Sequence, residues 1–319
     1  MQPRTRDVHV DKILTNISIA FRNRMYIADM IFPDVRVEYQ SDKYYIFPLE
    51  EWFRDEAQKR APGGRSVGGG FPLSTDSYFA EEIAYHTLLE DEVKQNADAV
   101  LRMEAAKTNF VTEKIFLNRE IKVSDIVFDS ANWENSVTLS GTDQWDDYDN
   151  SDPIDDLETA IDTVEEETGQ LVNTIVMGRE VWRGLKHHPQ LLDRLPLTGL
   201  KTATLQTLTA LLADQGDEQI QLRVLVGAAR KNDNARGATD QSLTPIWGKH
   251  CWIGHVAPSP GREIPSAGYN FVWPDNGQVR GVRRWRDEDH HSDKIEAFTR
   301  FDQKVTGKAL GYLIEDAVS

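Results

Sequence analysis

The sequence places its most metal-like side chains in one run of five, Asp287-Glu288-Asp289-His290-His291. Carboxylate and imidazole groups are ordinary ligands of divalent metals, so a metal-dependent hydrolase is one function that this run could serve. Adjacent residues point in different directions on any regular backbone, however, and five neighbours converge on one ion only in a specially shaped loop. The pattern therefore favours a charged loop that leads into a strand.

The other candidates for chemistry also favour structural roles. The acidic loop at 143–149 offers oxygen ligands for calcium, but its spacing does not match the EF-hand loop, and it is typical of a solvated face. Gly63-Gly64-Arg65-Ser66 lacks the Lys-Ser/Thr pair of a phosphate-binding loop. Cys251 would be nucleophilic if it were paired with His250, yet no oxyanion-hole pattern surrounds it, which favours a buried small residue. We therefore assign no catalytic residue, no cofactor-binding residue and no metal ligand.

The composition describes a large, acidic globular chain. Its 319 residues suffice for one large domain or two lobes with a buried core. A formal net charge of −16 repels nucleic acid on average and argues against tight DNA binding. One cysteine excludes an intramolecular disulfide, and no run of about 18 apolar residues predicts a membrane span. Residues 1–11 lack the apolar centre of a signal peptide.

The clearest local signals lie in residues 152–195, which predict a helix, a glycine, a strand and a second helix. Asp152 and Pro153 are typical of a helix start, and Gly169 is typical of a left-handed helix end. Between them, apolar residues recur at spacings of three and four, at Ile154, Leu157, Ile161 and Val164.

This periodicity fixes which side of the helix should face the core. It turns Ile161 inward, and it turns Asp162 and Glu165 toward solvent. The apolar run 171–177 predicts a buried strand. At the end of the second helix, His187-His188 would supply favourable positive charge.

The first part of the chain contains two segments that are not expected to form a hydrophobic core on their own. Residues 1–42 carry too many apolar side chains for a disordered tail, so this arm should bury itself on another surface. Residues 44–85 predict a two-stranded excursion whose tip, 54–70, is polar and glycine-rich. With about ten residues per strand, this excursion would reach roughly 33 Å. A projecting pair of strands is not stable alone in water, so it requires a partner surface.

The remaining segments alternate between helices and strands. Residues 90–116 predict a helix of roughly 37 Å, followed by a strand or short turn at 121–128. A leucine-rich helix is expected near 200–212, and a strand at 221–226. Residues 294–301 alternate apolar and charged side chains, as a half-exposed strand does.

The order of these motifs resembles the major capsid protein of tailed phages, in a branch of the Hong Kong 97-type fold. The resemblance covers nearly the whole chain and rests on short motifs in a fixed order: Asp152-Pro153, Thr168-Gly169, Asn173, Val176-Met177-Gly178, His188-Pro189, Leu225-Val226-Gly227, Ile246-Trp247-Gly248, Ala257-Pro258-Ser259-Pro260-Gly261, Phe271-Val272-Trp273 and Gly311-Tyr312-Leu313-Ile314.

This resemblance implies an α+β fold with an N-terminal arm, an extended β-hairpin loop, a peripheral domain with a long spine helix, and an axial domain. The implied divisions are 1–42 for the arm, 43–85 for the extended loop, 86–150 with 286–319 for the peripheral domain, and 151–285 for the axial domain. The loop would contact a neighbouring subunit through residues that are aromatic or charged: Trp52, Phe53, Arg54, Lys59, Arg60 and Arg65.

The resemblance further implies a structural protein, not an enzyme, that self-assembles into hexamers and pentamers of an icosahedral shell. Such a shell encloses double-stranded DNA without binding it specifically, and its subunits assemble in the host cytoplasm. Separate scaffolding and portal proteins are the expected partners, a decoration protein is an optional one, and no cofactor or membrane is expected. A nanocompartment shell of the encapsulin kind is the alternative reading, and the metal-dependent hydrolase is a weaker one.

Overall fold

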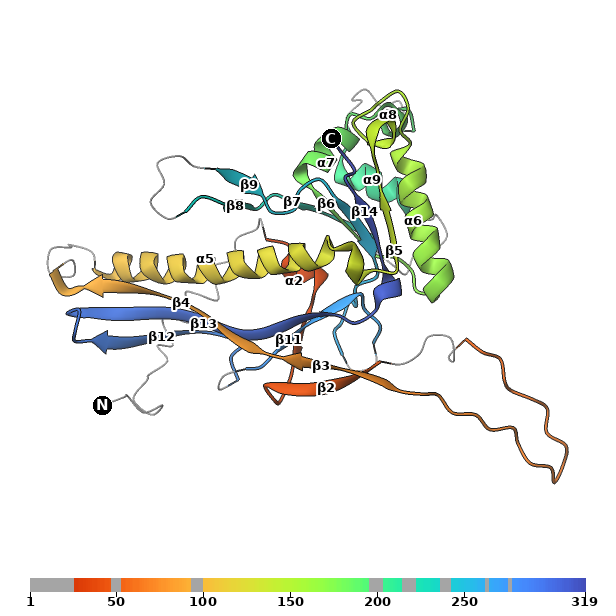
Figure 1. Ribbon diagram of the computed structural model, residues 1–319, viewed down its shortest axis with the longest axis horizontal. Helices are drawn as coiled ribbons and strands as arrows, with labels where there is room; N and C mark the ends of the chain where they lie inside the picture. The colour runs from red at the N-terminus through yellow and green to blue at the C-terminus, as the bar shows by residue number, and fades with distance from the viewer. Residues whose placement is uncertain are drawn as a thin grey trace.

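Two lobes and a projecting loop make up the molecule in its computed structural model (Figure 1). The structure describes residues 26–46, 53–92, 100–194, 203–213, 222–235, 242–261, 264–274 and 277–319. One lobe is a long helix lying beside long strands, and the other is a shorter sheet covered by helices (Figure 1).

The elements alternate between helices and strands along the chain, as a mixed α and β fold requires. The helices are α2 Ala28–Ile31, α5 Val100–Val127, α6 Pro153–Thr168, α7 Arg179–Leu185, α8 Pro189–Asp193 and α9 Leu205–Leu212, with 3-10 turns η1 Ser130–Asn132, η2 Gly141–Asp143 and η3 Lys308–Leu310. The strands are β1 Asp34–Arg36, β2 Ser41–Ile46, β3 Ser74–Phe79, β4 Glu81–Glu90, β5 Asn135–Thr138, β6 Thr174–Gly178, β7 Arg223–Gly227, β8 Arg230–Asn232, β9 Leu243–Pro245, β10 Cys251–Gly254, β11 Gly268–Val272, β12 Arg280–Asp287, β13 Ser292–Val305 and β14 Gly311–Glu315.

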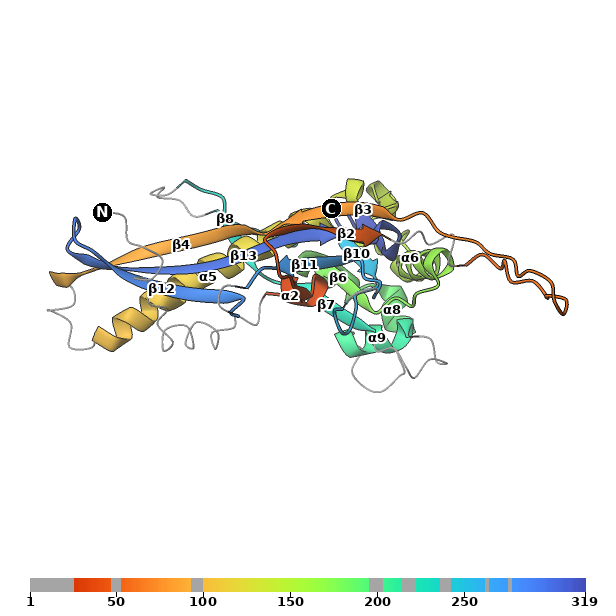
Figure 2. The same cartoon turned by 90° about the horizontal axis from the view of Figure 1, so that it is seen from below.

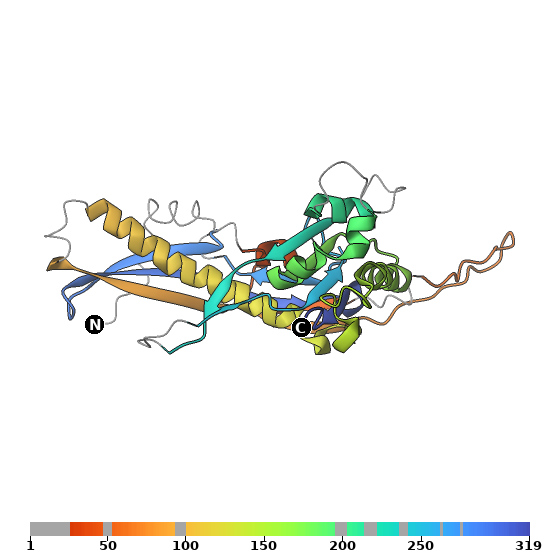
Figure 3. The same cartoon turned by 90° about the horizontal axis from the view of Figure 1, so that it is seen from above.

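Strand β13 organises the longer lobe. It pairs antiparallel with β4 on one side, and with β12 and then β11 on the other. Its 14 residues span about 46 Å, close to the length of α5. Helix α5 runs along one face of this sheet (Figure 3), and buried apolar residues such as Leu89, Val111, Val282 and Ile295 fill the layer between them.

The shorter lobe is built on the sheet β5-β14-β10-β6-β7. β10 lies at its centre and pairs antiparallel with both β6 and β14, whereas β7 and β5 join in parallel at the two edges. Helix α6 packs on this sheet and buries Ile154, Leu157 and Val164 against Ile175 and Ile314. A separate apolar layer lies between the first half of α5 and β13, and a third cluster joins the two lobes by packing Val123 and Val127 of α5 with Trp252 of β10.

The predicted boundaries of helix α6 are confirmed. The Asp152 carboxylate accepts a hydrogen bond from the backbone N–H of Asp155 at 3.2 Å, and Pro153 is the first helical residue. Gly169 ends the helix with a φ of +63°, the left-handed conformation in which glycine carries no steric penalty. The strand that follows begins at Thr174, three residues later than predicted.

The predicted orientation of α6 is correct for two of three side chains. Ile161 packs against the core but remains half-buried, and Asp162 is exposed. Glu165 was predicted to be exposed, and this is wrong, because it is half-buried and its Oε1 accepts a hydrogen bond from the Val172 N–H at 2.9 Å. The returning chain covers the end of the helix face that periodicity assigns to solvent.

The prediction for α5 stops too early. The helix continues to Val127, so the strand or short turn expected at 121–128 is wrong. The extension buries Arg119, Glu120 and Ser124 together with Val123 and Val127. This last part of α5 has a mixed polar composition, so the sequence did not predict it as helix. The partners of its polar side chains lie far away in the sequence.

The predicted two-stranded excursion is present, but its strands are shorter than ten residues. β2 and β3 pair over six residues each, from Ser41 opposite Phe79 to Ile46 opposite Ser74. β3 rests on the main sheet through Tyr78, whose ring stacks on Phe271 at 4.8 Å. Seen from below, the loop that leads into β3 extends past α6 (Figure 2).

The predicted charge at His187-His188 is wrong for His188. This side chain is fully buried, and burial lowers the pKa of its imidazole, so the neutral form is favoured. Its Nε2 lies 3.2 Å from Ser151 Oγ. His188 therefore tethers the start of α8 to Ser151, two residues before α6, instead of contributing positive charge.

Candidate functional site

The projecting loop, residues 53–73, combines exposed apolar side chains with exposed basic ones. No helix or strand occurs in it, and all its side chains are exposed. Its larger apolar side chains are Phe53, Val67, Phe71 and Leu73, which are 47–64% exposed. Exposed apolar groups grouped on one segment mark an interaction site more often than a free surface.

The structure places five of the six residues predicted to form an inter-subunit contact in this loop. Phe53 lies at its base, where its ring is near Gly169 at the end of α6. Arg54, Lys59, Arg60 and Arg65 follow along the exposed chain. Trp52 lies outside the described residues. The five side chains share a segment but do not converge on a pocket.

The loop is basic on an acidic protein. It carries four basic side chains against the two acidic ones of Asp55 and Glu56. Arg54 Nη1 lies 3.6 Å from Glu56 Oε1, an exposed pair of little energetic weight. Positive charge therefore remains toward the tip, around the turn in which the Gly64 N–H donates to the Ala61 carbonyl.

A second surface holds residues 26–36, the described end of the N-terminal arm, on its own subunit. Glu120 of α5 is fully buried and accepts hydrogen bonds from the N–H groups of Ile27, at 3.0 Å, and Ala28, at 2.9 Å. The same carboxylate accepts from Trp247 Nε1 at 2.6 Å. Burial raises the pKa of Glu120, and these three donors oppose that shift.

Arg119 completes this attachment from the adjacent position on α5. Its guanidinium pairs with Asp29 at 2.8 Å and with Asp34 at 2.7 Å. Asp34 also accepts a hydrogen bond from Asn270 of β11, next to which β1 adds as a parallel strand. The arm is therefore fixed by buried polar groups as well as by Ile31 and Phe32 in the core.

Sequence reasoning missed this attachment, although one signal for it was present. Arg119 stands in the i, i+4 row of Ile115, Val123 and Val127, an otherwise apolar helix face. A charged residue in such a row needs a partner, because burying an unpaired charge is costly. Its partners could not be named, since they lie 85 or more residues away.

The residues first considered for chemistry do not form a site. His290 Nδ1 contacts Asp287 Oδ2 at 3.1 Å within the exposed turn between β12 and β13. Within the ranges the structure describes, no group of three His, Cys, Asp or Glu side chains could hold a metal ion. Cys251 is fully buried in β10, and burial raises the pKa of its thiol, which disfavours the thiolate. No helix in the described part of the chain is long and apolar enough to cross a membrane.

Comparison with known proteins points to one group. The family described as "Phage major capsid protein E" matches residues 97–217. The major capsid protein of Burkholderia phage BcepMu is 25% identical over 317 residues, covering 96% of this chain and 95% of that protein. The major capsid protein of Pseudomonas phage JBD67 is 28% identical over 327 residues, covering 97% of each.

Solved structures agree with the sequence comparisons. A phage-related protein from Bordetella bronchiseptica RB50 has a TM-score of 0.75 at 27% identity, covering 97% of this chain and 98% of that one. The capsid of cyanophage P-SCSP1u has a TM-score of 0.58 at 10% identity, covering 94% and 90%, which shows likeness of fold.

The match to a phage capsid family, together with an α and β fold like that of a phage capsid, defines a structural protein of the virion. The matches to capsid proteins along nearly the whole chain make the assignment specific: this chain is a phage major capsid protein, the protein of the head shell.

Proposed function

We propose that the chain has the Hong Kong 97-type fold and builds a closed icosahedral shell of hexamers and pentamers. The observation that carries this proposal is the projecting loop, which exposes apolar and basic side chains beyond the body of the subunit (Figure 1). In the proposal, the loop lies on a neighbouring subunit, with Phe53, Arg54, Lys59, Arg60 and Arg65 in the contact. When these groups are buried on neighbouring subunits, many interfaces of modest strength together stabilise the shell.

We further propose the division into an arm at 1–42, an extended loop at 43–85, a peripheral domain at 86–150 with 286–319, and an axial domain at 151–285. Helix α5 then serves as the spine of the peripheral domain, and α6 with the sheet around β10 serves as the centre of the axial domain. β12 crosses the boundary at 285 because it pairs with β13 along its length. In this proposal the domains are units of assembly that share strands.

The remaining partners follow from the same proposal. Separate scaffolding and portal proteins assist assembly in the host cytoplasm, and a decoration protein is an optional addition. The shell encloses double-stranded DNA without specific binding. The net charge of −16 supports this, because an acidic lining repels packed DNA and does not trap it. No catalytic step and no cofactor enter the proposal.

Deletion of residues 53–70 tests the proposal. The paired ends of β2 and β3, Ile46 and Ser74, lie opposite each other, so the shortened connection can still close. We expect a folded subunit, seen by circular dichroism, that forms no closed shells in micrographs. Normal shells from this variant would refute the role of the loop, and an unfolded chain would show that the loop belongs to the core.

Two further measurements separate the alternatives. Double-stranded DNA in native particles is expected for a phage head, whereas particles that hold protein cargo and no DNA would favour the nanocompartment. Metal analysis after dialysis is expected to find far less than one ion per subunit. One tightly held ion per subunit would favour the hydrolase.

A further inference from the structure

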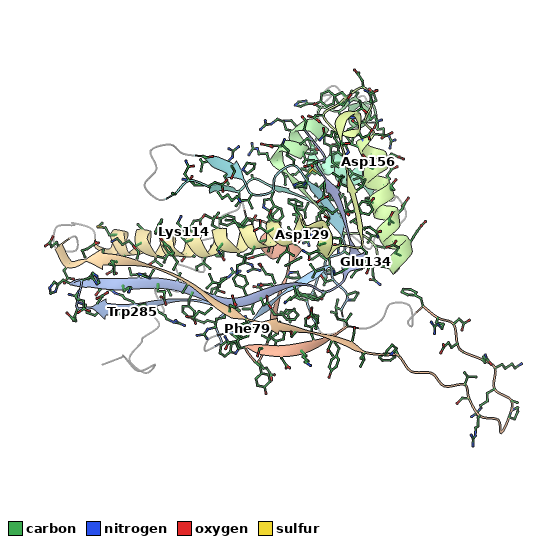
Figure 4. The ribbon with its side chains drawn as sticks, in the orientation of Figure 1. Phe79, Lys114, Asp129, Glu134, Asp156 and Trp285 are labelled. Atoms are coloured by element: carbon green, nitrogen blue, oxygen red, sulfur yellow. The ribbon has the colours of Figure 1, made fainter. Side chains whose placement is uncertain are left out.

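An acidic pocket lies where the end of α5 meets the turn before β10. Its volume is about 470 Å³, and nine residues from three distant stretches of the chain line it. Three of them are the carboxylates Asp125, Asp129 and Glu315, and none is Lys or Arg. Figure 4 labels Asp129 at the end of α5, in the angle between the two lobes.

Aromatic groups form part of the same lining. The rings of Phe128 and His250 both line the pocket, and their centroids are 5.1 Å apart. His250 is held in place because its Nδ1 accepts a hydrogen bond from the Asp316 N–H at 3.0 Å. Glu315 is fixed in turn by the Thr138 hydroxyl, which donates to it at 2.9 Å. The pocket is therefore an open depression in which hydrogen bonds hold His250 and Glu315 in place.

This lining suits a basic side chain. Carboxylates accept strong charge-assisted hydrogen bonds from guanidinium and ammonium groups, and an aromatic face attracts the same cations. Asp125 and Asp129 are both exposed, so a cation reaches them from outside. Lys249, between two lining residues, is exposed and not part of the lining, so it leaves the interior acidic.

The chain itself carries a segment of complementary charge. In the projecting loop, Lys59, Arg60 and Arg65 are exposed and make no ion pair with any residue that the structure describes. The loop extends away from the body of its own subunit (Figure 1), whereas Asp129 of the pocket lies between the two lobes (Figure 4).

We infer that this pocket receives basic side chains from the projecting loop of a second copy of the chain. The inference rests on the proposed function, because it names the surface on which the loop lies. It also explains why the loop is basic while the protein as a whole is acidic. Such contacts weaken as salt rises, since exposed ion pairs are screened.

Charge reversal with rescue tests the inference. We expect Asp125→Lys with Asp129→Lys to give folded subunits that no longer close shells. Reversal of the loop, with Lys59→Glu, Arg60→Glu and Arg65→Glu, is expected to have the same effect. Combining both sets is expected to restore shells in micrographs, because the opposite charges then meet again.

A matched control changes the same charge elsewhere. Asp162→Lys with Glu166→Lys alters two exposed carboxylates of α6 and is expected to leave shell formation intact. Normal shells from the pocket variant, or no rescue in the combined variant, would overturn the inference. Failure of the unaltered chain to form any shell would instead overturn the proposed function.

A disulfide trap gives an answer even if a reversed variant does not fold. Arg60→Cys combined with Asp129→Cys is expected to link neighbouring chains in oxidised particles, seen as covalent multimers on a non-reducing gel. Cys251 does not interfere, because it is fully buried. Each single variant should remain unlinked, and absence of multimers from the double variant in intact shells would overturn the inference.

Discussion

Glu120 shows how one side chain joins three parts of the subunit. It is a fully buried carboxylate that satisfies two N–H groups at the start of α2 and the indole of Trp247. Each of these donors would be buried without a partner if the carboxylate were removed. Unsatisfied buried donors cost about 1–3 kcal/mol each, so this position carries more of the stability than any exposed charge does.

We predict that Glu120→Ala destabilises the subunit by at least about 3 kcal/mol, because it leaves the donors of Ile27, Ala28 and Trp247 unpaired. Chemical denaturation of unassembled subunits measures the effect. Asp162→Ala, at an exposed position on α6, is the control and should cost less than about 0.5 kcal/mol. Similar losses for the two variants would show that Glu120 does not hold the arm.

The pH dependence of this group has a definite sign. Burial raises the pKa of Glu120 above the ordinary 4.5, so the folded state favours the protonated form. Its contribution to stability is then complete below pH 4.5 and is lost as pH rises through the raised pKa. We expect the free energy of unfolding of the unaltered chain, compared with that of Glu120→Gln, to decrease as pH rises through this range. A difference that grows with pH would contradict this.

Residues of α6 provide a graded series for packing. Leu157 is fully buried, Ile161 is half-buried and Asp162 is exposed. We predict that Leu157→Ala costs about 2–5 kcal/mol, that Ile161→Ala costs less because its side chain is only partly enclosed, and that Asp162→Ala costs least. Urea denaturation of unassembled subunits ranks them. A different order would mean that the helix is rotated about its axis.

At the scale of elements, local signals decided what could be predicted. The ends of α6 were predictable, because Asp152, Pro153 and Gly169 act through their own backbone positions. The end of α5 was not, because the burial of Arg119 and Glu120 depends on Asp34 and Trp247, which local sequence cannot reveal. The exposure of the site residues in the loop could be predicted from the sequence, whereas the existence of the pocket could not.

Gly178 is the position where two elements meet most closely. A Cβ atom there would lie 1.8 Å from the Gly248 carbonyl oxygen, so β6 and the turn before β10 would have to separate. We predict that Gly178→Ala prevents folding, measured by circular dichroism and thermal unfolding. Gly184→Ala, inside α7 with its nearest foreign atom Val318 Cγ1 at 3.3 Å, is the control and should fold. Normal stability of Gly178→Ala would refute the close approach.

At the scale of the whole molecule, the sheets join segments that lie far apart in the chain. β4 pairs with β13 across about two hundred residues, and β5 pairs with β14 across nearly as many. Alternation along residues 294–301 predicted a strand but could not name its neighbours. The pocket has the same origin, because it forms only when residues from α5, the turn before β10 and β14 come together.

The projecting loop also predicts how the whole molecule responds to protease. In free subunits, residues 53–73 are exposed and lack regular structure, so trypsin should cut first after Lys59, Arg60 or Arg65. In closed shells the same bonds should be protected, because the proposed contact covers them. Arg183 is exposed but lies within α7, so cleavage there should be slow in both states and serves as the control. Mass spectrometry of timed digests gives the rates. Equal rates of loop cleavage in free subunits and shells would contradict burial of the loop on a neighbour, whereas early cleavage after Arg183 would show that α7 itself opens.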